Sequence, residues 1–239
     1  GLPIIAAASD KGCETLGVGC LTERTASISF GSQASVQTMA RRYYEAEQFV
    51  PPFPAAIPGW YNPEIQIYRG FWMISWFKEQ FAQMETEEAA ALGMAPEDLL
   101  NQRLREIPPG CDGLVLQPYW GAGIKNPEAR GAIIGFSDVH TRIHLYRAII
   151  EGIGFALRGG LRQIEHKSHT PVTKIMISGG GSQSDEILKI AADIFDRPVH
   201  RVQTHETSGL GAAIIGYVSM GAFNSYGEAV QSMVHPADH

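Results

Sequence analysis

Hydrophobic and polar residues follow two different periods along this chain. Runs of strand length predict strands at residues 4–7, 25–30, 36–39, 113–117, 131–136, 175–177 and 199–202. Apolar residues three and four positions apart predict helices at residues 15–19, 68–81, 144–165, 187–195, 208–218 and 226–234, with acid-rich helical stretches between 84 and 106. Strands that meet in hairpins and then alternate with helices predict an α/β fold, a mixed β-sheet flanked by helices.

Residues 41–68 interrupt this pattern with a concentration of prolines and aromatic residues. The prolines are Pro51, Pro52, Pro54, Pro58 and Pro63. Proline lacks a backbone donor, so it is excluded from helix interiors and central strands. We therefore expect an ordered but irregular insertion on the surface, close to the site. In the helix that follows, the stripe expected in the core is Phe71, Ile74, Phe77 and Phe81.

Three consecutive glycines, Gly179, Gly180 and Gly181, connect a predicted strand to a predicted helix. Glycines in this frame expose backbone N–H groups at the positive end of the helix, where an anion can approach without meeting a Cβ. The pattern predicts a phosphate or nucleotide site. The simpler alternative is a tight turn, with Ser182 or Ser184 as the N-cap of the helix.

Two further strand ends carry polar residues that could do chemistry. Asp10 follows the run at 4–7 and precedes a helix, a place where α/β proteins carry catalytic groups, although an aspartate there is also a good N-cap. Gly31 and Ser32 follow the strand at 25–30. They could contact a phosphate through N–H and O–H groups, and they could equally form a plain hairpin turn.

Composition and charge narrow the class of protein. The 239 residues carry a formal net charge of −6 without a long basic run, which argues against a nucleic acid or an anionic membrane as partner. Three cysteines, Cys13, Cys20 and Cys111, form no CxxC pair, so we expect no disulfide framework and a reducing, cytoplasmic compartment. No apolar run has the length of a membrane-spanning helix. The chain begins without methionine and enters an apolar run at once, so we expect it to be part of a longer protein.

Histidines offer a weak metal alternative. His140 and His144 are four residues apart, and His166 and His169 are three apart. No Cys, Asp or Glu completes a ligand pattern around them, so we expect surface or helix-end histidines instead of a metal site.

Several segments together carry a family resemblance. Residues 131–136, Gly-Ala-Ile-Ile-Gly-Phe, are followed after seven residues by His-Leu-Tyr-Arg-Ala-Ile-Ile-Glu at 144–151. Residues 1–10 read Gly-Leu-Pro-Ile-Ile-Ala-Ala-Ala-Ser-Asp, and residues 178–184 read Ser-Gly-Gly-Gly-Ser-Gln-Ser. Nearly the whole chain resembles the C-terminal half of the FGGY carbohydrate kinases, the group that contains glycerol, xylulose and gluconate kinases. Phe136 departs from the pattern, where a smaller aliphatic residue is usual.

The resemblance implies roles for individual residues. Asp10 becomes the expected catalytic general base instead of a cap. Lys11 stands where the family often has a sugar-binding glutamine, so Asp10 and Lys11 are the expected substrate contacts. The expected ATP-binding residues are Gly31, Ser32, Gly70, Ser75, Gly180, Gly181 and Ser184. Mg²⁺ is expected as a cofactor held through water and the other half of the enzyme, with no direct ligand from this chain.

The resemblance also implies an architecture. The fold is expected to be an actin-like, ribonuclease-H-like domain spanning 1–239, and the parent is expected to be an ATP-dependent sugar kinase of about twice this length. Its partners would be a small sugar or polyol and its own N-terminal sugar-binding domain, and a homo-oligomer is left open. Without that domain the chain is expected to be inactive.

Two other functions stay open at this stage. One is a catalytically idle, nucleotide-responsive module of the actin and chaperone superfamily. The other is an NAD-dependent oxidoreductase, for which the glycine stretch matches G-x-G-x-x-G only in part, because the third glycine is missing.

Overall fold

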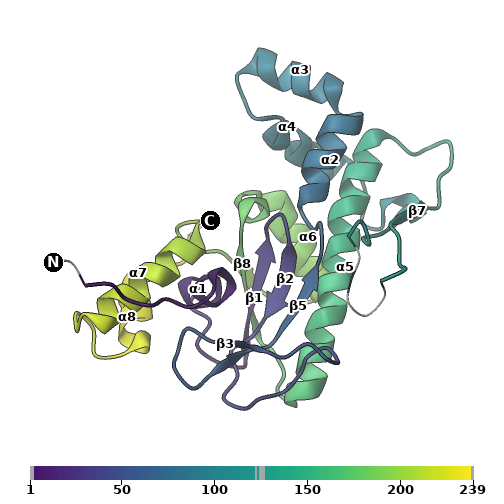
Figure 1. Ribbon diagram of the computed structural model, residues 1–239. Coiled ribbons are helices and arrows are strands. Elements are labelled where there is room, and N and C mark those ends of the chain that lie inside the picture. The colour runs from purple at the N-terminus through teal and green to yellow at the C-terminus, as the bar shows by residue number, and fades with distance from the viewer. Residues whose placement is uncertain (1–2, 122, 124–126, 238–239) are drawn as a thin grey trace.

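A five-stranded sheet forms the centre of the protein (Figure 1). The computed structural model describes residues 3–121, 123 and 127–237. The strands lie in the order β5-β2-β1-β8-β9, with bounds β1 (Thr25–Phe30), β2 (Ala34–Gln37), β5 (Glu64–Ile67), β8 (Lys174–Ser178) and β9 (Val199–His200). β2 is antiparallel to β1 and β5, whereas β8 is parallel to β1 and β9. The mixed sheet predicted from the sequence is confirmed.

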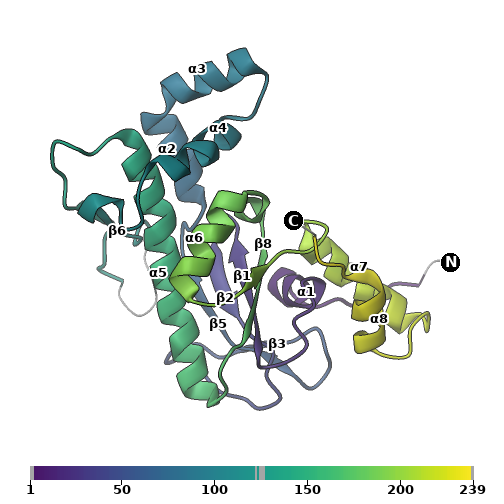
Figure 2. The same cartoon turned by 180° about the vertical axis from the view of Figure 1, so that it is seen from behind.

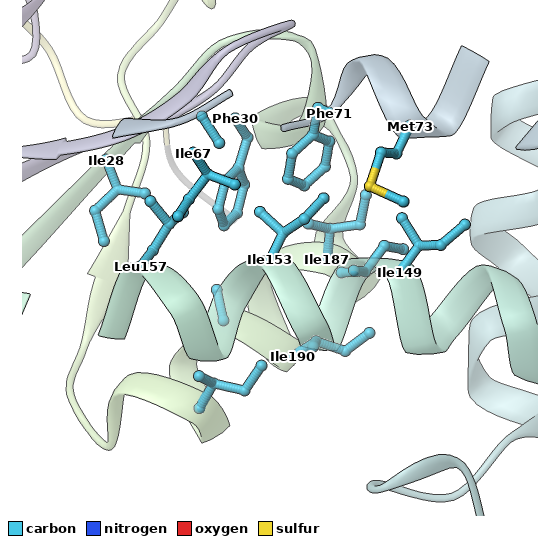
Figure 3. Close-up of a cluster of buried hydrophobic side chains, with 14 of the residues drawn as sticks. Ile28, Phe30, Ile67, Phe71, Met73, Ile149, Ile153, Leu157, Ile187 and Ile190 are labelled. Carbon is cyan, nitrogen blue, oxygen red and sulfur yellow. The ribbon is translucent and has the colours of Figure 1, made fainter. Parts of the chain in front are cut away.

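One face of the sheet packs against α5 (Arg142–Ser168) and α6 (Asp185–Phe195), as Figures 1 and 2 show from opposite sides. The strand residues on this face are apolar and the main hydrophobic core lies here. Figure 3 shows members of this core: Ile28, Phe30 and Ile67 of the strands, Ile149, Ile153 and Leu157 of α5, and Ile187 and Ile190 of α6. Each such side chain contributes roughly 1.5–3 kcal/mol when fully buried, so this face stabilises the sheet.

The opposite face is covered by α1 (Asp10–Gly17), which packs closely on α7 (Thr207–Ser219). α8 (Tyr226–Met233) packs beside α7, in the same apolar cluster as residues of α1 and α7. A Cβ placed on Gly17 would lie 1.9 Å from the backbone oxygen of Thr207. A Cβ on Gly211 would lie 1.9 Å from the backbone oxygen of Cys13. The two helices can approach this closely only because both contact positions are glycine.

Three helices form a projection beyond one end of the sheet (Figure 1). They are α2 (Trp72–Phe81), α3 (Gln83–Leu92) and α4 (Pro96–Arg103), followed by the short 3₁₀ helices η1 (Leu104–Glu106) and η2 (Cys111–Gly113). Two small antiparallel pairs complete the strands: β3 (Phe53–Pro54) with β4 (Tyr61–Asn62), and β6 (Val115–Gln117) with β7 (Ala132–Ile134). The projection places α2 and α4 beside the carboxyl ends of β1 and β8.

The strand predicted at residues 4–7 is wrong. In the part of the chain that the structure describes, residues 3–9 form no strand and pair with none, and the Ile4 side chain is fully exposed. Ile5 and Ala8 instead pack against the cluster formed by α1, α7 and α8. An apolar run without a neighbouring strand cannot satisfy its backbone groups in a ladder, so the segment stays irregular. The helix that follows begins at Asp10, earlier than predicted.

The irregular insertion expected at 41–68 is confirmed only in part, because it contains the short antiparallel pair of β3 and β4 and its last residues form the edge strand β5. Pro63 precedes β5, where a missing N–H does not break the ladder. The strand predicted as buried at 113–117 is mostly exposed, since β6 lies outside the main sheet and pairs with β7. Of the expected helical core stripe, Phe71, Ile74 and Phe77 are buried, whereas Phe81 is 41% exposed at the end of the projecting α2.

Candidate functional site

A cleft of about 560 Å³ opens at the carboxyl ends of β1 and β8, between the sheet and the projection. Six of the seven residues expected to bind ATP line this cleft: Gly31, Ser32, Ser75, Gly180, Gly181 and Ser184. They come from the β1–β2 turn, from α2 and from the loop between β8 and α6. The volume lies within the range of ordinary small-molecule sites. The structure therefore brings together residues that are up to 153 positions apart, from Gly31 to Ser184.

The glycine loop after β8 contains three residues in different environments. Gly179 has a φ of 80°, and a Cβ there would lie 2.8 Å from the backbone nitrogen of Gly31. A Cβ on Gly181 would lie 2.5 Å from the Phe71 ring. A Cβ on Gly180 would meet nothing within 4 Å. Close packing accounts for Gly179 and Gly181. Gly180 instead leaves its backbone accessible from the cleft.

Ser184 is the N-cap of α6, with its Oγ accepting a hydrogen bond from the Ile187 N–H at 3.4 Å. Ser182 has a different role, because its Oγ donates to the Gly179 carbonyl at 2.7 Å. The capping alternative is thus confirmed for Ser184, and Ser184 also lines the cleft. A capped first turn leaves the positive end of α6 at the wall of the cleft.

Gly31 and Ser32 form the turn of the β1–β2 hairpin, as the simpler alternative predicted. Their carbonyls accept hydrogen bonds from the Phe71 N–H at 3.1 Å and the Trp72 N–H at 3.4 Å. The turn thereby fixes the start of α2 and is at the same time one wall of the cleft. A hairpin turn and a ligand contact are compatible here.

Gly70 is the one expected ATP-binding residue outside the lining of the cleft among the described residues. A Cβ on Gly70 would lie 2.4 Å from the Ala34 side chain, so its small size is required by the approach of α2 to β2. Its contact with nucleotide stays a prediction.

The cleft also contains residues that the sequence did not indicate. Phe30 and Phe71 stack with ring centroids 4.5 Å apart. Tyr146 of α5 is buried and donates to Asn101 Oδ1 at 2.8 Å, and burial raises the pKa of the Tyr146 hydroxyl. Phe71 belongs to the stripe that the sequence places in the core, and Asn101 lies in the acid-rich helical stretch between 84 and 106. No local sequence signal distinguishes them, because the cleft is formed by contacts between distant elements.

Asp10 is the first residue of α1 and is exposed. The alternative that Asp10 caps this helix is wrong, since the N-cap is Ser9, whose Oγ accepts from the Gly12 N–H at 3.1 Å. Asp10 Oδ1 accepts from the Lys11 N–H at 2.8 Å, and the Asp10 carbonyl accepts from Ser208 Oγ at 3.2 Å. Asp10 is not among the residues that line the cleft.

Lys11 is turned towards the sheet. Its Nζ donates to Glu14 Oε2 at 2.7 Å and to Ser29 Oγ at 3.0 Å. The other carboxylate oxygen of Glu14 accepts from Ser178 Oγ. The side chains of Lys11 and Glu14 are 17% and 7% exposed. The sugar contact expected of Lys11 stays a prediction. In this structure its Nζ is bonded to Glu14 and Ser29.

More polar groups are buried beside this pair. Thr15 Oγ1 donates to Gln37 Oε1 at 2.9 Å and accepts from Asn62 Nδ2 at 3.0 Å. Burial raises the pKa of the Glu64 carboxyl, and the positive charge of Lys11 opposes this effect. Polar side chains therefore fill the space between α1 and the sheet.

Within the described residues no group of three or more His, Cys, Asp or Glu side chains is arranged to hold a metal ion. His140 bonds to Ser137 and the Cys111 carbonyl, and His144 bonds to Thr141 and Asp112. His166 and His169 end α5. The three cysteines are buried and unpaired. A helix long and apolar enough to cross a membrane is likewise not found among the residues described.

Comparisons with known proteins give a consistent result. Residues 26–220 match the model of the C-terminal domain of the FGGY family of carbohydrate kinases. The chain is 32% identical over its full length to an uncharacterized sugar kinase, YgcE, of Escherichia coli, and 28% identical over 97% of its length to a gluconokinase of Bacillus subtilis. It covers 49% and 46% of these two relatives, so it spans about half the length of the curated relatives it matches.

Solved structures agree with the sequence relatives. The fold superposes on the xylulose kinase from Rhodospirillum rubrum with a TM-score of 0.84 and 27% identity, covering all of this chain and 46% of that one. A gluconate kinase from Lactobacillus acidophilus gives a TM-score of 0.77 at 20% identity, over 95% of this chain and 44% of the other, and supports the fold alone. The α/β fold expected from the family resemblance is confirmed.

Proposed function

Because this chain belongs to the FGGY family of carbohydrate kinases and matches its C-terminal domain, we propose that it is the ATP-binding half of a kinase that phosphorylates a sugar or polyol hydroxyl. The observation that carries the proposal is the cleft at the ends of β1 and β8, which gathers six of the expected nucleotide-binding residues. Membership in this family rules against the oxidoreductase alternative. The parent would be about twice as long, with residues 1–239 forming one of its two domains.

The residues of the cleft suit a nucleotide. Gly180 leaves space for a phosphate or ribose to approach the backbone, and the first turn of α6 offers a positive helix end. Ser32 supplies a hydroxyl at the β1–β2 turn, beside Gly31. We assign Gly180, Gly181 and Ser184 to the adenosine side, and Gly31 and Ser32 to the terminal phosphates.

Mg²⁺ fits this arrangement without a dedicated protein cage, because it keeps several waters and binds through phosphates with one or two carboxylates. When bound, it neutralises charge on the phosphates. The contribution of this chain is to position the donor, since phosphoryl transfer depends mostly on positioning and electrostatic stabilisation. Asp10, exposed at the start of α1, would accept the proton of the attacking hydroxyl.

The test is Asp10→Asn in the full-length kinase, after ADP release on a panel of polyols, pentoses and aldonates has identified the acceptor. Turnover should fall by about 10²- to 10⁴-fold, the range for loss of a general base, with ATP affinity nearly unchanged. Asp193→Asn, a change at an exposed aspartate of α6, is the matched control and should leave turnover intact.

Full turnover in Asp10→Asn would refute the assignment of the base. A parent that phosphorylates no compound of the panel, yet binds ATP, would instead favour the catalytically idle nucleotide-responsive module.

A further inference from the structure

The sheet face beneath α1 is buried and polar, in contrast to the apolar face beneath α5. Alternate residues of the strands point to it, and the buried polar members are Ser27, Ser29, Ser35, Gln37, Glu64 and Ser178. A strand that is covered on both sides is usually a continuous hydrophobic run. Buried polar groups are costly unless they are paired, so a layer of this kind calls for a specific role.

The ion pair of Lys11 and Glu14 joins three segments within this layer. Both residues belong to α1, Lys11 donates to Ser29 of β1, and Glu14 accepts from Ser178 of β8. Ser29 and Ser178 are direct partners in the parallel pairing of β1 and β8. One ion pair therefore fixes α1 to the two central strands at a single level of the sheet.

That level lies immediately before each part of the candidate site. Ser29 stands two residues ahead of Gly31, and Ser178 stands two residues ahead of Gly180. Lys11 directly follows Asp10. A shift of α1 along the sheet would change the position of Asp10 relative to both loops. A misplacement of about 1 Å can reduce a rate by about 10²-fold. Contacts at this level of the sheet therefore affect how Asp10 is aligned with the two loops.

The environment of Lys11 suits a holding role better than contact with a sugar. Its charge is compensated by Glu14 at 2.7 Å, and its side chain is 83% buried, the complement of a 17% exposed fraction. Glu14 is in turn engaged at both carboxylate oxygens. Charged groups that are buried and fully engaged lose more by rearranging than exposed ones do.

We propose that Lys11 and Glu14 are positioning residues that hold Asp10 in register with the glycine loops after β1 and β8. Acting through Asp10, they link the acceptor end of the site to the donor end. The inference rests on the proposed function, because it takes Asp10 as the general base and the cleft as the ATP site.

The experiment uses the full-length kinase with Lys11→Met, and with Lys11→Met/Glu14→Gln, which leaves no uncompensated charge. Both should lower kcat by about 10- to 100-fold while KM for ATP and for the sugar change by less than about threefold. Lys11→Arg, which keeps the charge and donors, should recover most of the loss. Lys189→Met, which removes an ion pair with Glu186 at an exposed position of α6, is the control and should leave kcat unchanged.

A double-mutant cycle separates positioning from general stability. In the Asp10→Asn background, Lys11→Met should lower turnover by less than about twofold further, since groups that act as a unit are non-additive. Losses that multiply would overturn the inference. An increase in the sugar KM with kcat unchanged would overturn it too, and would give Lys11 to the acceptor.

Failure of the two proposals can be told apart. If Asp10→Asn retains turnover, the proposed base is wrong; if Asp10→Asn is inactive and Lys11→Met is fully active, only the positioning role is wrong. Should the Lys11 variants not fold, Ser29→Ala and Ser178→Ala keep both charges and each remove one tether. They should lower kcat selectively, and unchanged kcat in both would overturn the inference.

Discussion

Gly179, Gly180 and Gly181 are consecutive, yet packing requires only the first and third of them, each for a different reason. Gly179 adopts a positive φ and lies against the backbone of Gly31, which no side chain would permit. Gly181 lies under the Phe71 ring. Only Gly180 has open space around its missing side chain. A glycine-rich motif can thus mix packing requirements with ligand access, and the sequence alone does not separate them.

This difference predicts opposite outcomes for two neighbouring substitutions. Gly181→Ala should destabilise the protein by about 1–3 kcal/mol, because its Cβ would overlap Phe71 and Phe30. Gly180→Ala should leave the melting temperature unchanged, but should weaken ATP binding by about tenfold, or about 1.4 kcal/mol, because its methyl group would occupy the cleft. Thermal denaturation and ATP titration of the full-length kinase measure both effects. Equal ATP affinity for Gly180→Ala and the unsubstituted protein would contradict the placement of nucleotide at this loop.

At the same scale, the sequence predicted candidate site residues through motifs and missed those that depend on tertiary contacts. Gly31, Ser32 and Gly180 are recognisable because a glycine at a strand end has a local meaning. Tyr146 and Asn101 meet only when α4 packs beside α5. The partners of Lys11 could not be predicted either, because they depend on the pairing of β1 with β8.

At the scale of the elements, the close packing of α1 against α7 helps to fix the position of α1, and with it Asp10, the candidate base. Gly17 and Gly211 allow the backbones to touch, and α7 also carries Ser208, which donates to the Asp10 carbonyl. α7 consequently supports α1 from the side opposite the sheet.

We predict that Gly211→Ala separates these helices and lowers the free energy of unfolding by about 1–3 kcal/mol, the usual range for overpacking. Gly216→Ala is the control in the same helix, because its Cβ would meet nothing within 4 Å. It should be neutral or stabilising by up to about 1 kcal/mol, from helix propensity. Urea denaturation of both variants gives the comparison, and equal stabilities would show that the crossing tolerates a methyl group.

The sequence predicts well the elements with a strong hydrophobic period. It does not predict those whose structure depends on pairing with another part of the chain. β1 and β8 follow directly from alternating or β-branched residues, and α6 from its helical spacing. β5 was not predicted because proline density in 41–68 obscured four residues that gain strand structure by pairing with β2. Residues 4–7 failed in the opposite direction, since apolar residues alone do not supply a partner strand.

At the scale of the whole molecule, the chain corresponds to about half of its relatives, so the cleft it presents is expected to close only with a second domain. We predict that the isolated chain binds ATP more weakly than about 1 μM and transfers no phosphate to any sugar. A helix-end interaction with phosphate contributes about 0.3–1 kcal/mol when exposed, which is too little for tight binding. Calorimetry and an ADP-release assay on residues 1–239 check this, and submicromolar affinity would contradict it.

The opposed faces of the sheet give each strand two kinds of requirement. Beneath α5, the effect of a substitution on stability depends on the volume of the new side chain, because the neighbours of Ile28 are apolar and closely packed. Beneath α1, the fit of a substitution depends on the hydrogen bonds that the new side chain can give and accept, as Ser29 accepts one from Lys11 Nζ. Successive residues of β1 therefore face different environments. We expect it to tolerate apolar residues of similar volume on the α5 side and small hydrogen-bonding residues on the α1 side, alternating along the strand.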